Sequence, residues 1–217
     1  MTEKRNAEKF WVWAELNRGL IRETLKAARR SIPGVHIVNV EPLIAEMTGV
    51  LHEYDARLQP LIALAADDVL ELTITANGRR DAFVSAKSLV DCAPAGPSWR
   101  FYGLRRRRPV KHALLDGREL RGVESIQFGY TRNGEQVGVT LIVSDDLIDQ
   151  LPSLQAAGRH VTMALLGEED FGYHVAGTSV VSAAGWKAGH FDMPIWPLDE
   201  LPSRVDALFH RELEQVA

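Results

Sequence analysis

Four consecutive arginines, Arg105 to Arg108, are the most concentrated group of charged side chains in this sequence. A guanidinium group donates paired hydrogen bonds to a carboxylate or a phosphate, so such a run can bind an acidic protein segment or RNA. The aromatic-rich segment from Trp99 to Leu104 favours a strand that leads into the arginines. On a regular strand alternate side chains share a face, so Arg105 and Arg107 are expected to act together. The alternative is an edge strand that its charges protect against aggregation.

The arginines Arg106 and Arg108 would then point to the opposite face of the same strand. We take the whole run, with Trp11, as the candidate binding site. The expected partner is an acidic protein or RNA, and the interaction would have to be local because the net charge of the chain is −4.

A second group of charged residues is acidic, since Glu168, Glu169 and Asp170 follow one another. Carboxylates held close together separate their pKa values and can transfer protons or bind a hard cation. With a histidine such as His174, this cluster would supply the groups of an enzyme of unrecognised type. The alternative is a solvated helix end, in which the acidic residues stand at a carboxyl terminus and oppose the helix dipole.

The tryptophans are candidates for stacking on bases or for lining a peptide groove: Trp11, Trp13, Trp99, Trp186 and Trp196. We expect Trp13 and Trp99 to be buried, because both fall on apolar faces of their elements. Trp11 lies ~100° round the helix from Phe10, off the main apolar stripe. It is therefore the tryptophan that we expect to be exposed.

Motifs of the common enzyme classes do not occur in the sequence. We find no Gly-rich phosphate loop, no dinucleotide-binding glycine pattern and no nucleophile elbow. Cys92 is the only cysteine, which excludes an internal disulfide and a multi-cysteine metal site. We expect no catalytic residues, no metal and no cofactor, and favour a protein that is not an enzyme.

The composition of the 217-residue chain, with 46% hydrophobic and 25% charged residues, is typical of a globular protein. No apolar run approaches the ~20 residues that span a bilayer. The amino terminus lacks the pattern of a signal peptide. We therefore expect a cytoplasmic protein that does not enter membranes.

These residues must be positioned by an α+β fold, with a mostly antiparallel sheet and helices packed on one face. We expect one domain over residues 1–217, with a helical hairpin at 6–60 and the sheet with further helices at 61–217. Helical periodicity covers residues 6–30 and 42–58, and antiparallel strands are predicted at 61–65 and 69–75. Asp81 is the predicted N-cap of the next helix, which leads to the strand at 99–104.

The strongest local signal is a hairpin over residues 123–143, because Asn133-Gly134 separates two alternating segments. A helix is predicted from Pro152, a strand at 173–181 and an ordered loop at 185–197. A final amphipathic helix follows Pro202.

Three segments resemble a family of uncharacterised bacterial proteins, a domain of unknown function sometimes found beside ribonuclease-inhibitor-like modules. They are Phe10-Trp11-Val12-Trp13, the run LELTITANG with APAGPSWRFYGLRRR after it, and Leu166-Gly167-Glu168. Ala14 departs from the pattern, which has an aromatic residue there. The resemblance implies a bacterial cytoplasmic domain whose tryptophans pack the core and which has an interaction role. Residues and resemblance together predict an interaction or regulatory module, with the enzyme as the alternative.

Overall fold

The computed structural model describes residues 2–30, 40–110, 113–115, 118–120, 125–145, 151–189 and 193–209. The chain divides into two compact units, Met1–Arg105 and Arg106–Ala217. Each unit has its own hydrophobic core. From the sequence we expected one domain whose helical part ends at residue 60. The single domain stays a prediction, while the first helices and the strands that follow them share one core and the compact units divide after Arg105.

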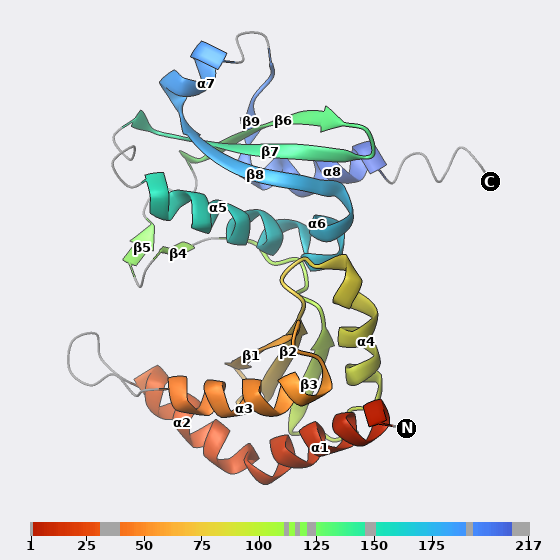
Figure 1. Ribbon diagram of the computed structural model, residues 1–217. Helices are drawn as coiled ribbons and strands as arrows, with labels where there is room; N and C mark the ends of the chain where they lie inside the picture. The colour runs from red at the N-terminus through yellow and green to blue at the C-terminus, as the bar shows by residue number, and fades with distance from the viewer. Residues whose placement is uncertain are drawn as a thin grey trace. The chain divides into compact units, whose positions relative to one another are not determined.

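The first unit consists of four α-helices, one 3-10 turn and a three-stranded sheet of order β1-β2-β3 in its described residues. The helices are α1 (Thr2–Leu16), α2 (Arg18–Arg30), α3 (Glu41–Tyr54) and α4 (Phe83–Asp91), with the 3-10 turn η1 (Arg80–Ala82) before α4. The strands are β1 (Gln59–Leu64), β2 (Leu70–Thr75) and β3 (Trp99–Gly103). Figure 1 shows α4 running beside β3, while α1, α2 and α3 lie together.

The strand β2 is the centre of this sheet. Leu70, Leu72 and Ile74 are completely buried, as their alternation with polar residues predicts, and Thr73 and Thr75 on the other face are buried as well. β2 pairs antiparallel with β1 and parallel with β3, so that β2, α4 and β3 form a crossover unit. The carboxyl ends of β2 and β3 therefore lie side by side.

The second unit contains a four-stranded sheet of order β8-β7-β6-β9 and a separate two-stranded ladder. The sheet strands are β6 (Gln127–Asn133), β7 (Gln136–Val143), β8 (Val175–Ser182) and β9 (Trp196–Pro197), and the ladder is formed by β4 (Ala113–Leu115) and β5 (Arg118–Leu120). The helices are α5 (Leu151–Leu166), α6 (Glu168–His174), α7 (Ala183–Gly189) and α8 (Leu201–Phe209), with the 3-10 turn η4 (Leu198–Glu200) before α8.

The predicted hairpin is confirmed as β6 and β7, which pair antiparallel up to Asn133 and Gln136. Its turn residues are Gly134 and Glu135, one position later than the predicted Asn133-Gly134, because Asn133 belongs to β6. Gly134 opens the two-residue turn with φ 62, a conformation that glycine adopts without strain. The first residues of the predicted strand, 123 and 124, lie outside the described residues.

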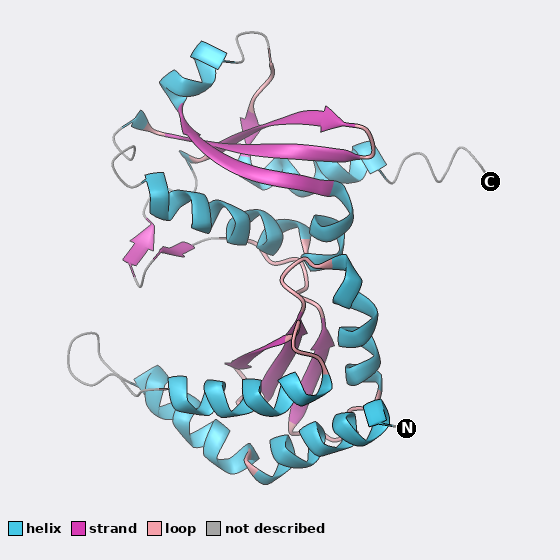
Figure 2. Ribbon diagram, in the orientation of Figure 1, coloured by secondary structure: helices cyan, strands magenta, loops and turns pink. Residues whose placement is uncertain are grey.

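One face of the second sheet packs on α5, α6 and α8 through a shared core. The ring of Trp186, on α7, lies directly against Gly129 of β6. The helix α7 is on the opposite side of the sheet from α5, as the ribbon in Figure 2 shows. The fold class is α+β, as predicted, with antiparallel pairing in most of the described ladders and parallel pairing in β2–β3 and β7–β8.

Two elements differ from the sequence prediction. The helix expected over residues 6–30 is interrupted at Asn17, whose side-chain amide donates to the Trp13 carbonyl. A side chain that bonds the local backbone competes with the regular helix. The loop expected at 185–197 contains the end of α7 and the short strand β9. Within the described residues no helix is both long enough and apolar enough to cross a membrane.

Candidate functional site

The arginine run is not a strand. β3 ends at Gly103, and Leu104 has φ 75, which turns the chain out of the extended conformation. Residues 105–110 belong to no helix or strand. The alternation that would have placed Arg105 and Arg107 on one face is therefore absent. The division between the two units also falls inside the run, after Arg105.

Arg105 is half-buried at the carboxyl end of β3, where neutral groups position its guanidinium. Its Nη2 donates to the Asn77 side-chain oxygen at 2.7 Å, and its Nε donates to the Thr75 hydroxyl at 3.2 Å. Thr75 is completely buried, and Asn77 also donates to Gln59 on β1. The guanidinium is therefore fixed by groups of the sheet and of the turn after β2.

Arg107 belongs to an ion-pair cluster of the second unit. Its guanidinium donates to Asp170 of α6 and to Asp206 of α8, each at 2.6 Å, and to the Leu166 carbonyl at 2.9 Å. The hydrogen bond to Asp206, with that to Asp170, raises the pKa of Arg107 above its usual range. Arg107 thus links α5, α6 and α8, which is a structural role.

The other two arginines of the run, Arg106 and Arg108, are exposed. The backbone N–H of Arg108 donates to the Ala164 carbonyl of α5 at 2.7 Å, which ties the chain to the second unit.

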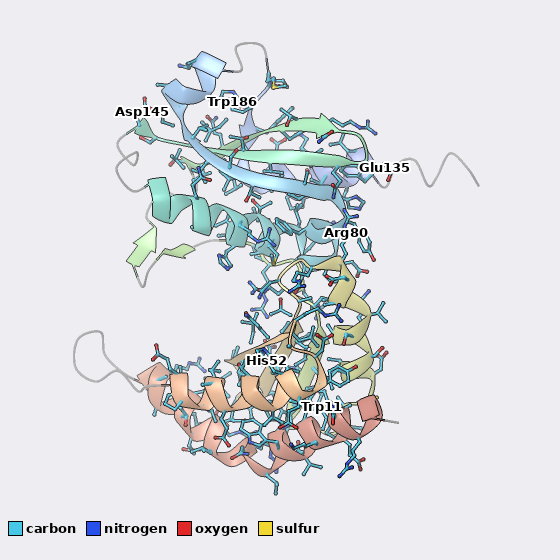
Figure 3. All side chains as sticks on the ribbon, viewed as in Figure 1. Trp11, His52, Arg80, Glu135, Asp145 and Trp186 are labelled. Atoms are coloured by element: carbon cyan, nitrogen blue, oxygen red, sulfur yellow. The ribbon has the colours of Figure 1, made fainter. Side chains whose placement is uncertain are left out.

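Further arginines that the sequence did not single out come from the chain segments that meet at the same end of the first sheet as Arg105. Arg57, from the loop before β1, donates to Asp55 at 2.6 Å and to Asp81 at 3.0 Å. Arg79 lies 3.6 Å from the same Asp81 carboxylate, and Arg80 begins the turn before α4. We call this set the basic corner: Arg57, Arg79, Arg80 and Arg105, with the carboxylates Asp55 and Asp81. Figure 3 labels Arg80 at the amino-terminal end of α4.

The carboxylates of the basic corner are held ionised by their neighbours. Hydrogen bonds from Arg57 hold the pKa of Asp55 well below its usual range and also lower the pKa of Asp81. The same bonds raise the pKa of Arg57. Asp81 was the predicted N-cap of α4, yet α4 has no side-chain cap and Asp81 pairs with arginines instead. The six groups together carry four positive and two negative charges.

The position of the basic corner follows from the chain path. In an open sheet, ligands bind beyond the carboxyl ends of parallel strands, where loops lead into helices. Here the loop after β2 supplies Asn77, Arg79 and Arg80, and the loop after β3 supplies Arg105. The signal for this position in the sequence is the Asn77-Gly78 turn followed at once by two arginines.

The acidic cluster stands at the beginning of a helix and not at a carboxyl terminus as predicted. α5 ends at Leu166, Gly167 has φ 77, and α6 begins at Glu168. Acidic residues in the first turn stabilise the helix dipole, so the expected conflict is absent. Glu168 is completely buried, Glu169 is exposed and Asp170 pairs with Arg107.

The histidine suggested as catalytic partner of these acids is at the other end of the same helix. His174 stacks on Phe209 of α8, with ring centroids 4.3 Å apart. Six residues at 1.5 Å each separate Glu168 from His174 by about 9 Å along the axis. Asp170 is four residues before His174 and so lies on the same side of the helix, but its carboxylate is paired with Arg107.

The prediction that Trp11 is the exposed tryptophan is wrong. Trp11 is only 4% exposed, because its Nε1 donates to the Leu89 carbonyl and its ring packs edge-on against Phe101. Trp99 is buried as predicted, whereas Trp13 is half-buried and donates to Glu46. Trp11 therefore does not offer an exposed ring for stacking.

Within the part of the chain that the structure describes, no three His, Cys, Asp or Glu residues converge as a metal site requires. Comparisons with protein-family models, with curated proteins and with solved structures found no match to this chain. The family resemblance therefore stays a prediction from the three sequence segments.

Proposed function

We propose that this protein is an interaction module that binds an acidic segment of a partner protein at the basic corner. The observation that carries the proposal is that three chain segments place four arginines beyond the carboxyl ends of β2 and β3. Arg57 and Arg79 share the Asp81 carboxylate there, and Arg105 is held by Asn77. This replaces the basic strand as the binding element.

The chemistry of the basic corner suits a row of carboxylates. Arg105 is fixed by neutral oxygen atoms of Thr75 and Asn77, so its guanidinium needs little ordering on binding. Arg79 and Arg80 are exposed and can donate paired hydrogen bonds to an incoming carboxylate. Asp81 is an internal competitor, because it accepts from the arginine side chains that the partner would use.

An acidic protein is favoured over RNA because single-stranded RNA is bound largely by stacking of its bases on exposed aromatic rings. Of the three indole rings of the first unit, Trp11 and Trp99 are buried, and Trp13 is half-buried and tied to Glu46 by its hydrogen bond. Charge pairing without stacking is the mode of recognition for an acidic peptide.

The test measures binding of a fluorescent oligoglutamate peptide by anisotropy at increasing salt concentrations. Arg79→Ala/Arg80→Ala should weaken binding about tenfold or more, since each charge-assisted hydrogen bond contributes about 1.5 kcal/mol. The matched control is Arg29→Ala/Arg100→Ala, which removes two exposed arginines of the same unit outside the basic corner. Asp81→Asn should strengthen binding, because it removes the internal competitor.

A parent protein that fails to bind the peptide at low salt would contradict the proposal, as would equal losses in the double variant and its control. A single-stranded oligoribonucleotide of equal charge serves as the second probe. If it binds more tightly than the peptide and depends on the same arginines, the partner is RNA and the choice of an acidic protein is wrong.

A further inference from the structure

A second surface of the first unit is an apolar groove along α1. It has a volume of about 480 Å³ and is bounded by one stripe of α1, from Ala7 to Leu16, and by Cys92 and Pro94 after α4. Its floor is the buried ring of Trp11, which the Leu89 carbonyl holds in place. The groove and the basic corner have no residue in common, so the two surfaces can be tested separately.

The groove presents apolar side chains to solvent. Val12 is 54% exposed and Leu16 is 81% exposed, although α1 already buries Phe10 and Ala14 on its other side. A helix that is apolar on a second, exposed face is typical of a surface that binds a partner. The four-residue step from Val12 to Leu16 places both side chains on the same side of the helix.

The charges at the groove have one sign. Its two charged lining residues, Glu8 and Glu15, are both carboxylates. They are seven residues apart, which puts them on one face and about 10.5 Å apart along the helix axis. Glu15 also accepts from Arg18 at 3.0 Å, an exposed pair that a partner cation can replace at little cost.

We propose that the groove binds a basic amphipathic helix of a partner protein. The nine steps from Ala7 to Leu16 give the groove a length of about 14 Å, and apolar anchors at i, i+4 and i+7 of a helix span about 10.5 Å. Lysines or arginines of the partner, seven residues apart, pair with Glu8 and Glu15 beside these anchors. The pattern is that of charged pairs flanking an apolar helix seam.

The probe is a synthetic helical peptide with leucines at i, i+4 and i+7 and two lysines seven residues apart, labelled for anisotropy. Its matched peptide carries glutamates in place of the lysines. Leu16→Ser should weaken binding of the lysine peptide about tenfold or more, because burial of a leucine side chain contributes about 1.5 kcal/mol or more. The control Val84→Ser removes another exposed apolar side chain, on α4 outside the groove, and should change binding less than about twofold.

Charge reversal tests the electrostatic part. Glu8→Lys/Glu15→Lys should weaken binding of the lysine peptide and strengthen binding of the glutamate peptide. Equal affinity of the parent for both peptides, or equal effects of Leu16→Ser and Val84→Ser, would overturn the proposal. Sedimentation velocity is run in parallel: a dimer that Leu16→Ser dissociates would make the occupant a second copy of this chain, which also overturns it.

Discussion

Replacement of Gly129 by alanine is predicted to destabilise the second unit, because the added methyl group would clash with the indole ring of Trp186. A Cβ atom at this position would lie 2.5 Å from Cζ2 and 3.2 Å from Cζ3 of Trp186, and closer still to Cη2. Carbon atoms in favourable contact are about 3.5–4.0 Å apart, so the ring must move by about 1 Å. Trp186 is only 4% exposed, which limits the space for this movement.

The expected cost of Gly129→Ala is that of overpacking, about 1–3 kcal/mol. For a unit of this size the melting temperature should fall by roughly 4–12 °C. Gly177→Ala is the matched control, because Gly177 is in the same sheet and a Cβ there would meet nothing within 4 Å. This control should leave stability unchanged or raise it by a few tenths of a kcal/mol.

A double-mutant cycle with Trp186→Ala isolates the contact, with stability measured by denaturant unfolding. Trp186→Ala alone should cost about 3 kcal/mol or more, as for other buried aromatic side chains. In that background the methyl group has room, so Gly129→Ala should be neutral or slightly stabilising. An equal loss from Gly129→Ala with and without the indole ring would refute the reasoning.

Two other substitutions and one calorimetric measurement test separate parts of the structure. Hydrogen bonds from Arg57 hold the pKa of Asp55 low, so their stabilisation is present above about pH 4 and lost as the pH falls toward the lowered pKa. Asp55→Asn should therefore cost about 1–2 kcal/mol in denaturant unfolding at pH 7, and the difference from the parent should shrink below pH ~3. Arg107→Ala should lower stability by about 1 kcal/mol, because its pairs with acids such as Asp206 are half-exposed, and should leave oligoglutamate binding unchanged. Calorimetry of the full chain should resolve two transitions, of which Gly129→Ala lowers only one, and a single transition that shifts as a whole would support one cooperative domain.

Local chemistry made the regular parts of the fold predictable. The hairpin needed only Asn133-Gly134 between alternating residues, and β2 needed only the alternation of Leu70, Leu72 and Ile74. Both signals act within a few residues of the chain. The prediction of the α+β class followed from them.

The candidate site was less predictable, because its partners are distant in sequence. Trp11 is buried through the Leu89 carbonyl, 78 residues away, and Arg107 is held by Asp206, 99 residues away. The helical periodicity and the strand alternation each describe a single helix or strand, so neither pattern can predict a contact between two distant elements. Leu104 added a backbone effect, because its positive φ ends the strand just before the arginines and is uncommon for leucine.

The irregular path of the chain through residues 105–110 determines where a protease would cut this protein. Proteases of trypsin specificity cut after arginine, and they require an accessible backbone outside helices and sheets. Arg106 is exposed in such a stretch, at the point where the first unit ends. A cut after Arg106 leaves Arg105 with the basic corner and the groove on one fragment, and the Arg107 ion-pair cluster intact on the other. One peptide bond thus separates both proposed binding surfaces from the carboxyl-terminal sheet.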